Sequence, residues 1–149
     1  CYNHYATAEM LLGEMKRYVT DKFCGILLKK AQEGSREYAL INMGVGYVNF
    51  FAENPHYFTF IYDSQDYSIE LTDSTFEGDF EPFRIFKETA LRCMELKCIP
   101  EETYRDNLVI MWAAVHGMAA MANMGGFHYQ GDWGALAEKL LISKVRLAD

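Results

Sequence analysis

The stretch that decides the fold is Met111-Trp112-Ala113-Ala114-Val115-His116-Gly117-Met118. Trp112 and His116 are four residues apart, so in a helix they lie on the same face. Small residues at 113, 117 and 120 form a stripe beside them, along which a second helix can approach closely. The stretch therefore predicts a helix that packs tightly against a neighbouring helix.

Helical patterns continue on both sides of this stretch. The spacing of apolar residues predicts six helices, over residues 7–32, 36–53, 55–62, 80–97, 101–124 and 132–147. Pro55, Pro82 and Pro100 each lie where a helix is expected to begin, and Thr7 is the expected N-cap of the first helix. The segment 57–62 also fits a strand by propensity, but its Asn-Pro start favours a helix. Residues 63–79 are acidic and poorly periodic and are expected to form a loop, so the fold class is all-α.

The charge distribution excludes a broad nucleic-acid surface on this chain. The net charge is −7, and residues 37–83 carry nine acidic residues with no Lys or Arg. Phosphate contacts require Lys and Arg, so a DNA contact would have to come from elsewhere. No stretch of 18 apolar residues and no secretion signal is apparent, which predicts a cytoplasmic protein with no membrane partner and free thiols at its cysteines.

The start of the chain gives a second informative segment. Cys1-Tyr2-Asn3-His4-Tyr5 precedes Thr7, Glu9 and a Leu11-Leu12 pair. Together with Trp112-x-x-x-His116-Gly117, this segment resembles TetR family transcriptional regulators, in which the end of a helix-turn-helix DNA reader leads into a long helix. The chain departs from that pattern at Tyr5, where Phe is usual, and at Ala8, where Lys is common.

The resemblance implies a division of the chain and its partners. Residues 1–6 would be the end of a helix-turn-helix headpiece, and residues 7–149 the ligand-binding and dimerisation domain. Since the chain begins with Cys1 rather than Met, most of the headpiece is expected to be missing or unseen. The whole protein would be a repressor that binds operator DNA through that headpiece, with Tyr2 and His4 near the DNA backbone.

The resemblance also implies a homodimer, built as a four-helix bundle from the last two helices of each subunit. The expected interface residues are Ala113, Gly117, Ala120, Met121, Met124, Trp133, Leu136, Leu140 and Leu141.

The resemblance further implies a small-molecule effector inside the domain. Aromatic and Met side chains with a few polar tips are the usual lining of such sites, and also of an ordinary core. The residues expected to face inward and line the site are Tyr18, Met43, Tyr47, Phe50, Phe58, Phe83, Phe86, Met94, Met111, Trp112, Val115 and His116. The expected ligand is small and largely apolar or aromatic.

Two other functions remain open at this point. One is a helical dimerisation domain with a filled core and no ligand. The other is a helical enzyme, or a helical protein that binds haem or another small molecule, that uses His116 or His56. The sequence shows no Gly-x-Ser-x-Gly motif, phosphate-binding loop or zinc-ligand spacing, so no catalytic residue, metal or cofactor is predicted. A non-enzymatic regulator is the expectation.

Overall fold

A computed structural model describes residues 4–63, 66–72 and 75–145. The elements are α1 (His4–Ala31), the 3-10 turn η1 (Arg36–Tyr38), α2 (Ala39–Glu53), α3 (Pro55–Tyr62), β1 (Ile69–Leu71), β2 (Phe76–Gly78), α4 (Glu81–Leu96), the 3-10 turn η2 (Glu101–Thr103), α5 (Tyr104–Ala122) and α6 (Trp133–Val145). The predicted all-α class with six helices is confirmed. Thr7 is not an N-cap, because α1 already begins at His4, and the expected end of the last helix at 147 lies outside the described residues.

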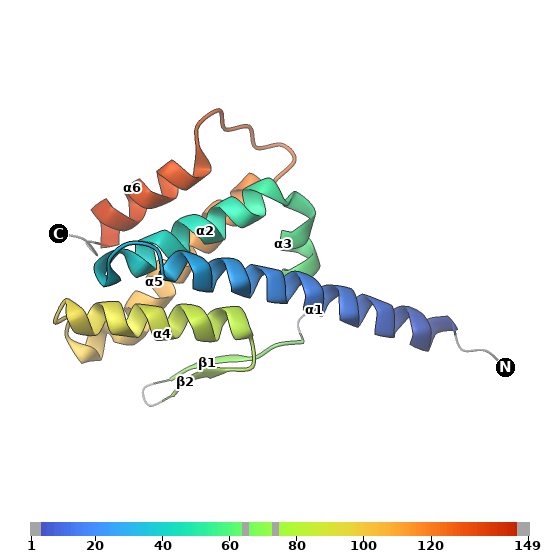
Figure 1. Ribbon diagram of the computed structural model, residues 1–149, viewed down its shortest axis with the longest axis horizontal. Helices are drawn as coiled ribbons and strands as arrows, with labels where there is room; N and C mark the ends of the chain where they lie inside the picture. The colour runs from blue at the N-terminus through green and yellow to red at the C-terminus, as the bar shows by residue number, and fades with distance from the viewer. Residues whose placement is uncertain (1–3, 64–65, 73–74, 146–149) are drawn as a thin grey trace.

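Helix α2 is the centre of the domain and contacts each of the other five α-helices (Figure 1). Nine of its fifteen residues are buried, five of the others are partly buried, and only Glu53 at its end is exposed. A helix that is apolar all round is stable only inside a layer of other helices. In Figure 1, α6 and α1 lie on opposite sides of α2, and α4 lies beyond α1.

Two glycines let the neighbouring helices approach α2 closely. A Cβ atom at Gly44 would lie 2.4 Å from Leu141 of α6, and one at Gly46 would lie 2.7 Å from Lys30 of α1. The two positions point in nearly opposite directions because each residue turns a helix by about 100°. The pair therefore seats α6 and α1 on opposite faces of α2.

The N-terminal half of α1 is exposed, in contrast to its C-terminal half. Met10, Leu11 and Leu12 are each more than half exposed, whereas Phe23 and Leu27 are fully buried. This helix extends past the other elements at its N-terminal end (Figure 1). None of the helices in the described part of the chain combines the length and apolarity needed to span a bilayer.

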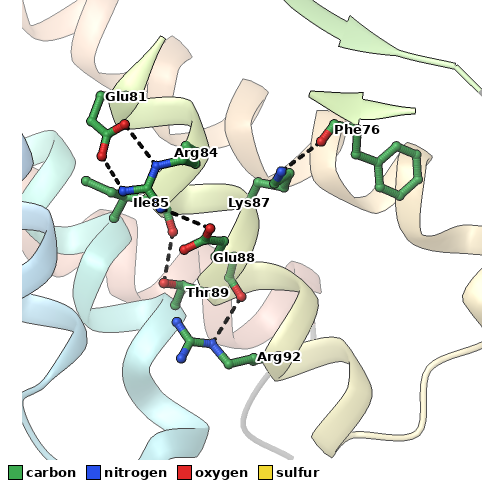
Figure 2. Close-up of polar contacts among 8 residues, drawn as sticks. All are labelled: Phe76, Glu81, Arg84, Ile85, Lys87, Glu88, Thr89 and Arg92. Atoms are coloured by element: carbon green, nitrogen blue, oxygen red, sulfur yellow. Dashed lines mark hydrogen bonds and ion pairs between the residues drawn. The ribbon is translucent and has the colours of Figure 1, made fainter. Parts of the chain in front are cut away.

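The expectation of a loop over 63–79 is wrong, because the segment contains an antiparallel hairpin. Ile69 pairs with Gly78 and Leu71 with Phe76. Exposed Glu70 alternates with partly buried Ile69 and Leu71, the pattern of a half-buried strand. The Lys87 ammonium of α4 donates a hydrogen bond of 2.8 Å to the Phe76 carbonyl, which fastens the hairpin to α4 (Figure 2).

We predict opposite effects of the same substitution at two helical glycines. Gly44→Ala should lower the free energy of unfolding by about 1–2 kcal/mol, because overpacking against Leu141 and Val115 exceeds the gain in helix propensity. Gly25→Ala in α1 is the matched control: its new Cβ meets nothing within 4 Å, so it should stabilise by about 0.5–1 kcal/mol. Chemical denaturation measures both, and equal stabilisation by the two variants would contradict the close α2–α6 contact.

Candidate functional site

The interior contains a chain of three polar side chains from three helices. The hydroxyl of Tyr47 in α2 lies 2.6 Å from the hydroxyl of Tyr62 in α3 and 2.8 Å from Nδ1 of His116 in α5. Tyr47 is 2% exposed, whereas Tyr62 and His116 are partly buried, so this polar chain runs from the core toward its edge. Buried polar groups are retained only when they are hydrogen-bonded, and here they satisfy one another.

One direction of these hydrogen bonds uses every hydroxyl proton. If Tyr62 donates to Tyr47 and Tyr47 donates to Nδ1 of His116, both protons have an acceptor, and the imidazole carries its own proton on Nε2. The reverse direction would leave the Tyr62 proton without an acceptor among the described residues. The geometry therefore favours His116 as a neutral acceptor.

Burial keeps these groups uncharged. It raises the pKa of Tyr47 and Tyr62 well above the ordinary tyrosine value and lowers the pKa of His116. In each case the main cause is the loss of solvation of the charged form. The site therefore presents neutral donors and acceptors at neutral pH.

Aromatic rings enclose this polar chain. Trp112 stacks on His116 with ring centroids 6.2 Å apart and an angle of 18°, and Phe58 and Tyr62 approach the imidazole at 5.0 and 4.6 Å. Phe86 of α4 meets Trp112 at 5.1 Å. We call Tyr47, Phe58, Tyr62, Trp112 and His116 the aromatic–polar cluster.

The structure places most of the predicted lining residues in the core. Phe58, Trp112 and His116 are partly buried, and the fully buried ones are Met43, Tyr47, Phe50, Phe83, Phe86, Met94, Met111 and Val115. Tyr18 is wrongly predicted to face inward: it lies at the middle of α1 beside the buried Val19, but its own side chain is 65% exposed. Tyr62 was not predicted, although it follows Phe58 by one helical turn.

The predicted interface residues divide into two groups. Ala113 and Met121 are exposed on one face of α5, with partly buried Gly117 and Ala120 beside them, and a Cβ at Gly117 would meet nothing within 4 Å. Met124 is exposed just beyond the end of α5. Trp133, Leu136 and Leu140 of α6 are partly buried. Leu141, expected at the interface, is 2% exposed within a single chain, since it fills the space above Gly44. Sequence reasoning also missed Ile110, which is 56% exposed on the same face as Ala113.

The remaining site predictions fall at the edges of the described chain. Tyr2 lies outside the described residues, and at His4 the structure describes the start of α1 but not the side chain.

No group of three potential metal ligands is present among the described residues. A pocket between the ends of α1 and α4 and a shallower hollow beside the hairpin are lined neither by a predicted ligand residue nor by the aromatic–polar cluster.

Comparison with known proteins gives one family match. Residues 40–143 match a family model described as the tetracyclin repressor-like, C-terminal domain. The match includes α2 to α5 and nearly all of α6, and therefore Tyr47, Tyr62 and His116. No curated protein and no solved structure matches the chain.

We predict that His116 makes the fold acid-sensitive. Its pKa is lowered below the ordinary value of 6.5, so the unfolded chain binds the proton more readily than the folded one. The stability is therefore complete above pH 6.5 and falls as the pH drops from that value toward the folded-state pKa. Urea denaturation between pH 8 and pH 5 should show a smaller fall for His116→Asn, which keeps an acceptor but cannot titrate. His56→Asn, at an exposed position of α3, is the control, and an unchanged pH dependence in His116→Asn would contradict the prediction.

Proposed function

The chain belongs to the tetracyclin repressor-like C-terminal domain family, and on this basis we propose that it is the effector-sensing and dimerisation part of a cytoplasmic TetR-like repressor. The whole protein would bind operator DNA through a helix-turn-helix headpiece. In this proposal the domain performs no catalysis: it binds a small molecule and passes the change to the headpiece.

The aromatic–polar cluster is the observation that carries the effector proposal. It combines a large aromatic surface with hydroxyl and imidazole groups in one water-poor place, which is the composition of small-molecule sites. A plain core would be more stable with apolar residues of the same shape, because polar groups there add a desolvation cost. The hydrogen-bonded chain is therefore better explained by recognition than by stability alone.

The chemistry of the cluster indicates the class of effector. Its groups are neutral, so a charged ligand would lose its solvation without gaining a counter-charge. A neutral aromatic molecule with one hydroxyl group can replace a ring of the cluster and take over one of its hydrogen bonds. Because the cluster is packed, entry requires side chains such as Phe58 and Trp112 to move.

Helix α1 is the element that would pass binding on to a headpiece. Its buried Phe23 contacts Tyr47 with ring centroids 5.0 Å apart, and Phe50 and Phe51 at 5.0 and 4.9 Å. A movement of the Tyr47 ring would therefore displace Phe23 and, with it, α1. Coupling free energies of about 1–3 kcal/mol are typical of such systems and change the affinity for DNA several-fold or more.

We predict that a neutral phenol binds at the cluster. 4-Propylphenol should raise the melting temperature of the protein in a dose-dependent way, and propylbenzene, which lacks the hydroxyl, should do so much less. Tyr47→Phe should remove the difference between the two probes. His56→Asn is the control, because His56 is exposed and outside the cluster.

A different outcome would favour the second candidate function. The rings of the cluster are packed against one another, as expected for a domain with a filled core that only dimerises. Absence of any shift with both probes, in a protein that dimerises, would support that function and contradict effector binding at the cluster.

The exposed face of α5 supports the proposed homodimer. Ile110, Ala113, Gly117 and Met121 follow one another along α5 at spacings of three or four residues, so they form one apolar stripe, and Met124 follows just beyond the end of the helix. Ile110 and Met124 are each more than half exposed, which is costly unless a partner covers them. With the neighbouring α6, this stripe would supply two helices of a four-helix bundle.

We predict that the native protein elutes with twice the mass of one chain and that Ala113→Glu shifts it to the monomer. A charge buried within the stripe would lack a partner and disfavour association strongly. Thr59→Glu, on an exposed position of α3, is the control and should leave the dimer intact. Light scattering after size-exclusion chromatography measures the mass, and a dimeric Ala113→Glu variant would contradict this interface.

A further inference from the structure

A pocket of about 840 Å³ lies at the end of the domain where the last turns of α1 and α4 meet η1 and the start of α2. It shares no residue with the aromatic–polar cluster. The turn that forms one side is fixed by its own chemistry: Gly34 adopts a positive φ of 72°, and the Asn42 amide donates a 2.7 Å hydrogen bond to the Glu33 carbonyl. The size is within the range of sites that hold small organic molecules.

Apolar side chains from two helices line this pocket. Leu28 of α1 and Leu96 of α4 are 46% and 55% exposed, and Ala31 and Ala39 complete the apolar part of the wall. Two leucines left open to solvent around one hollow are unfavourable in the empty protein. They favour a ligand with an apolar body.

Two arginines give the pocket its charge. Arg36 of η1 and Arg92 of α4 both line it, against a single carboxylate from Glu95. Neither guanidinium forms an ion pair with a carboxylate of the described residues, and Arg92 uses only its Nε atom, which donates to the Glu88 carbonyl at 3.3 Å (Figure 2). Arg84, two turns earlier on α4, is by contrast paired with both Glu81 and Glu88.

The polar groups of the floor are already satisfied. The Thr89 hydroxyl donates to the Ile85 carbonyl at 3.0 Å, and the Cys93 thiol donates to the Arg36 carbonyl at 3.7 Å. These two groups offer no further strong donor, so the donors that can meet an anion are the two guanidinium groups and the neutral amide of Gln32, and only the guanidinium groups carry a charge. Arg is suited to a carboxylate because its planar fork matches both oxygens.

We propose that this pocket binds an amphipathic monocarboxylate, with the carboxylate between Arg36 and Arg92 and the apolar body against Leu28 and Leu96. The ligand is chemically distinct from the neutral effector of the aromatic–polar cluster, and the proposal does not depend on that effector. A ligand here would contact α1, η1 and α4 together, and would tie the C-terminal end of α1 to α4.

Isothermal titration calorimetry with decanoate tests the proposal, with decan-1-ol as the uncharged probe of the same length. Decanoate should bind at one site per chain, and decan-1-ol about tenfold or more weakly. The Arg36→Gln/Arg92→Gln variant should bind decanoate about tenfold or more weakly, as expected for the loss of charge-assisted hydrogen bonds. Leu28→Gln should weaken both probes.

Matched control variants distinguish binding in this pocket from a general attraction of anions to positive charge on the protein surface. Arg17→Gln/Lys139→Gln loses the same charge at exposed positions of α1 and α6 and should bind decanoate normally. Tyr47→Phe should also bind decanoate normally, which keeps this result separate from that of the phenol probes. No binding of decanoate to the native protein, equal binding of decan-1-ol, or unchanged affinity in the double arginine variant would each overturn the proposal.

Discussion

The close contact of α2 with helices on its opposite faces is the constraint on which the rest of the structure depends. Gly44 admits Leu141 of α6, and Gly46 admits the stem of Lys30 of α1. At the far end of the α2–α6 contact, Gly134 of α6 lies against Asn49 in the same way. Because protein interiors are close-packed, one methyl group added to α2 at these positions would displace the helix that packs there.

The aromatic–polar cluster follows from this arrangement. Tyr47 is adjacent to Gly46 and nearly one turn after Gly44, so its ring enters the space that the close contacts define. Once there, its hydroxyl must find partners, and Tyr62 and His116 supply them from α3 and α5. Tyr47 therefore takes part both in the packing around α2 and in the hydrogen bonds to Tyr62 and His116. A ligand that displaced Tyr47 would disturb several helices at once.

The sequence predicted the helices well because their signals are local. Apolar periodicity, proline at the first turn and the Trp112-to-His116 spacing each depend on a few neighbouring residues. The hairpin was missed because its strands are only three residues long and lie in an acidic segment, although the alternation around Glu70 was visible.

The candidate site was predicted less completely, because its contacts are long-range. Inward-facing Tyr47 and His116 were identified from helical periodicity, but Tyr62 meets them only through the placement of α3. Tyr18 was placed wrongly for the same reason: periodicity gives the face of a helix and not whether another element covers it. Arg36 and Arg92 are 56 residues apart in the chain, so no local pattern brings them to one pocket.

The unequal burial of α1 makes that helix a lever. Val19 is the first residue of the helix that is firmly held in the core, and about 22 Å of helix separates it from His4. A rotation of about 5° at this pivot displaces the N-terminal end by about 2 Å, at a rise of about 1.5 Å per residue. Small motions at the centre of the domain are thus magnified at the start of α1. A displacement of about 2 Å there is enough to make or break a hydrogen bond.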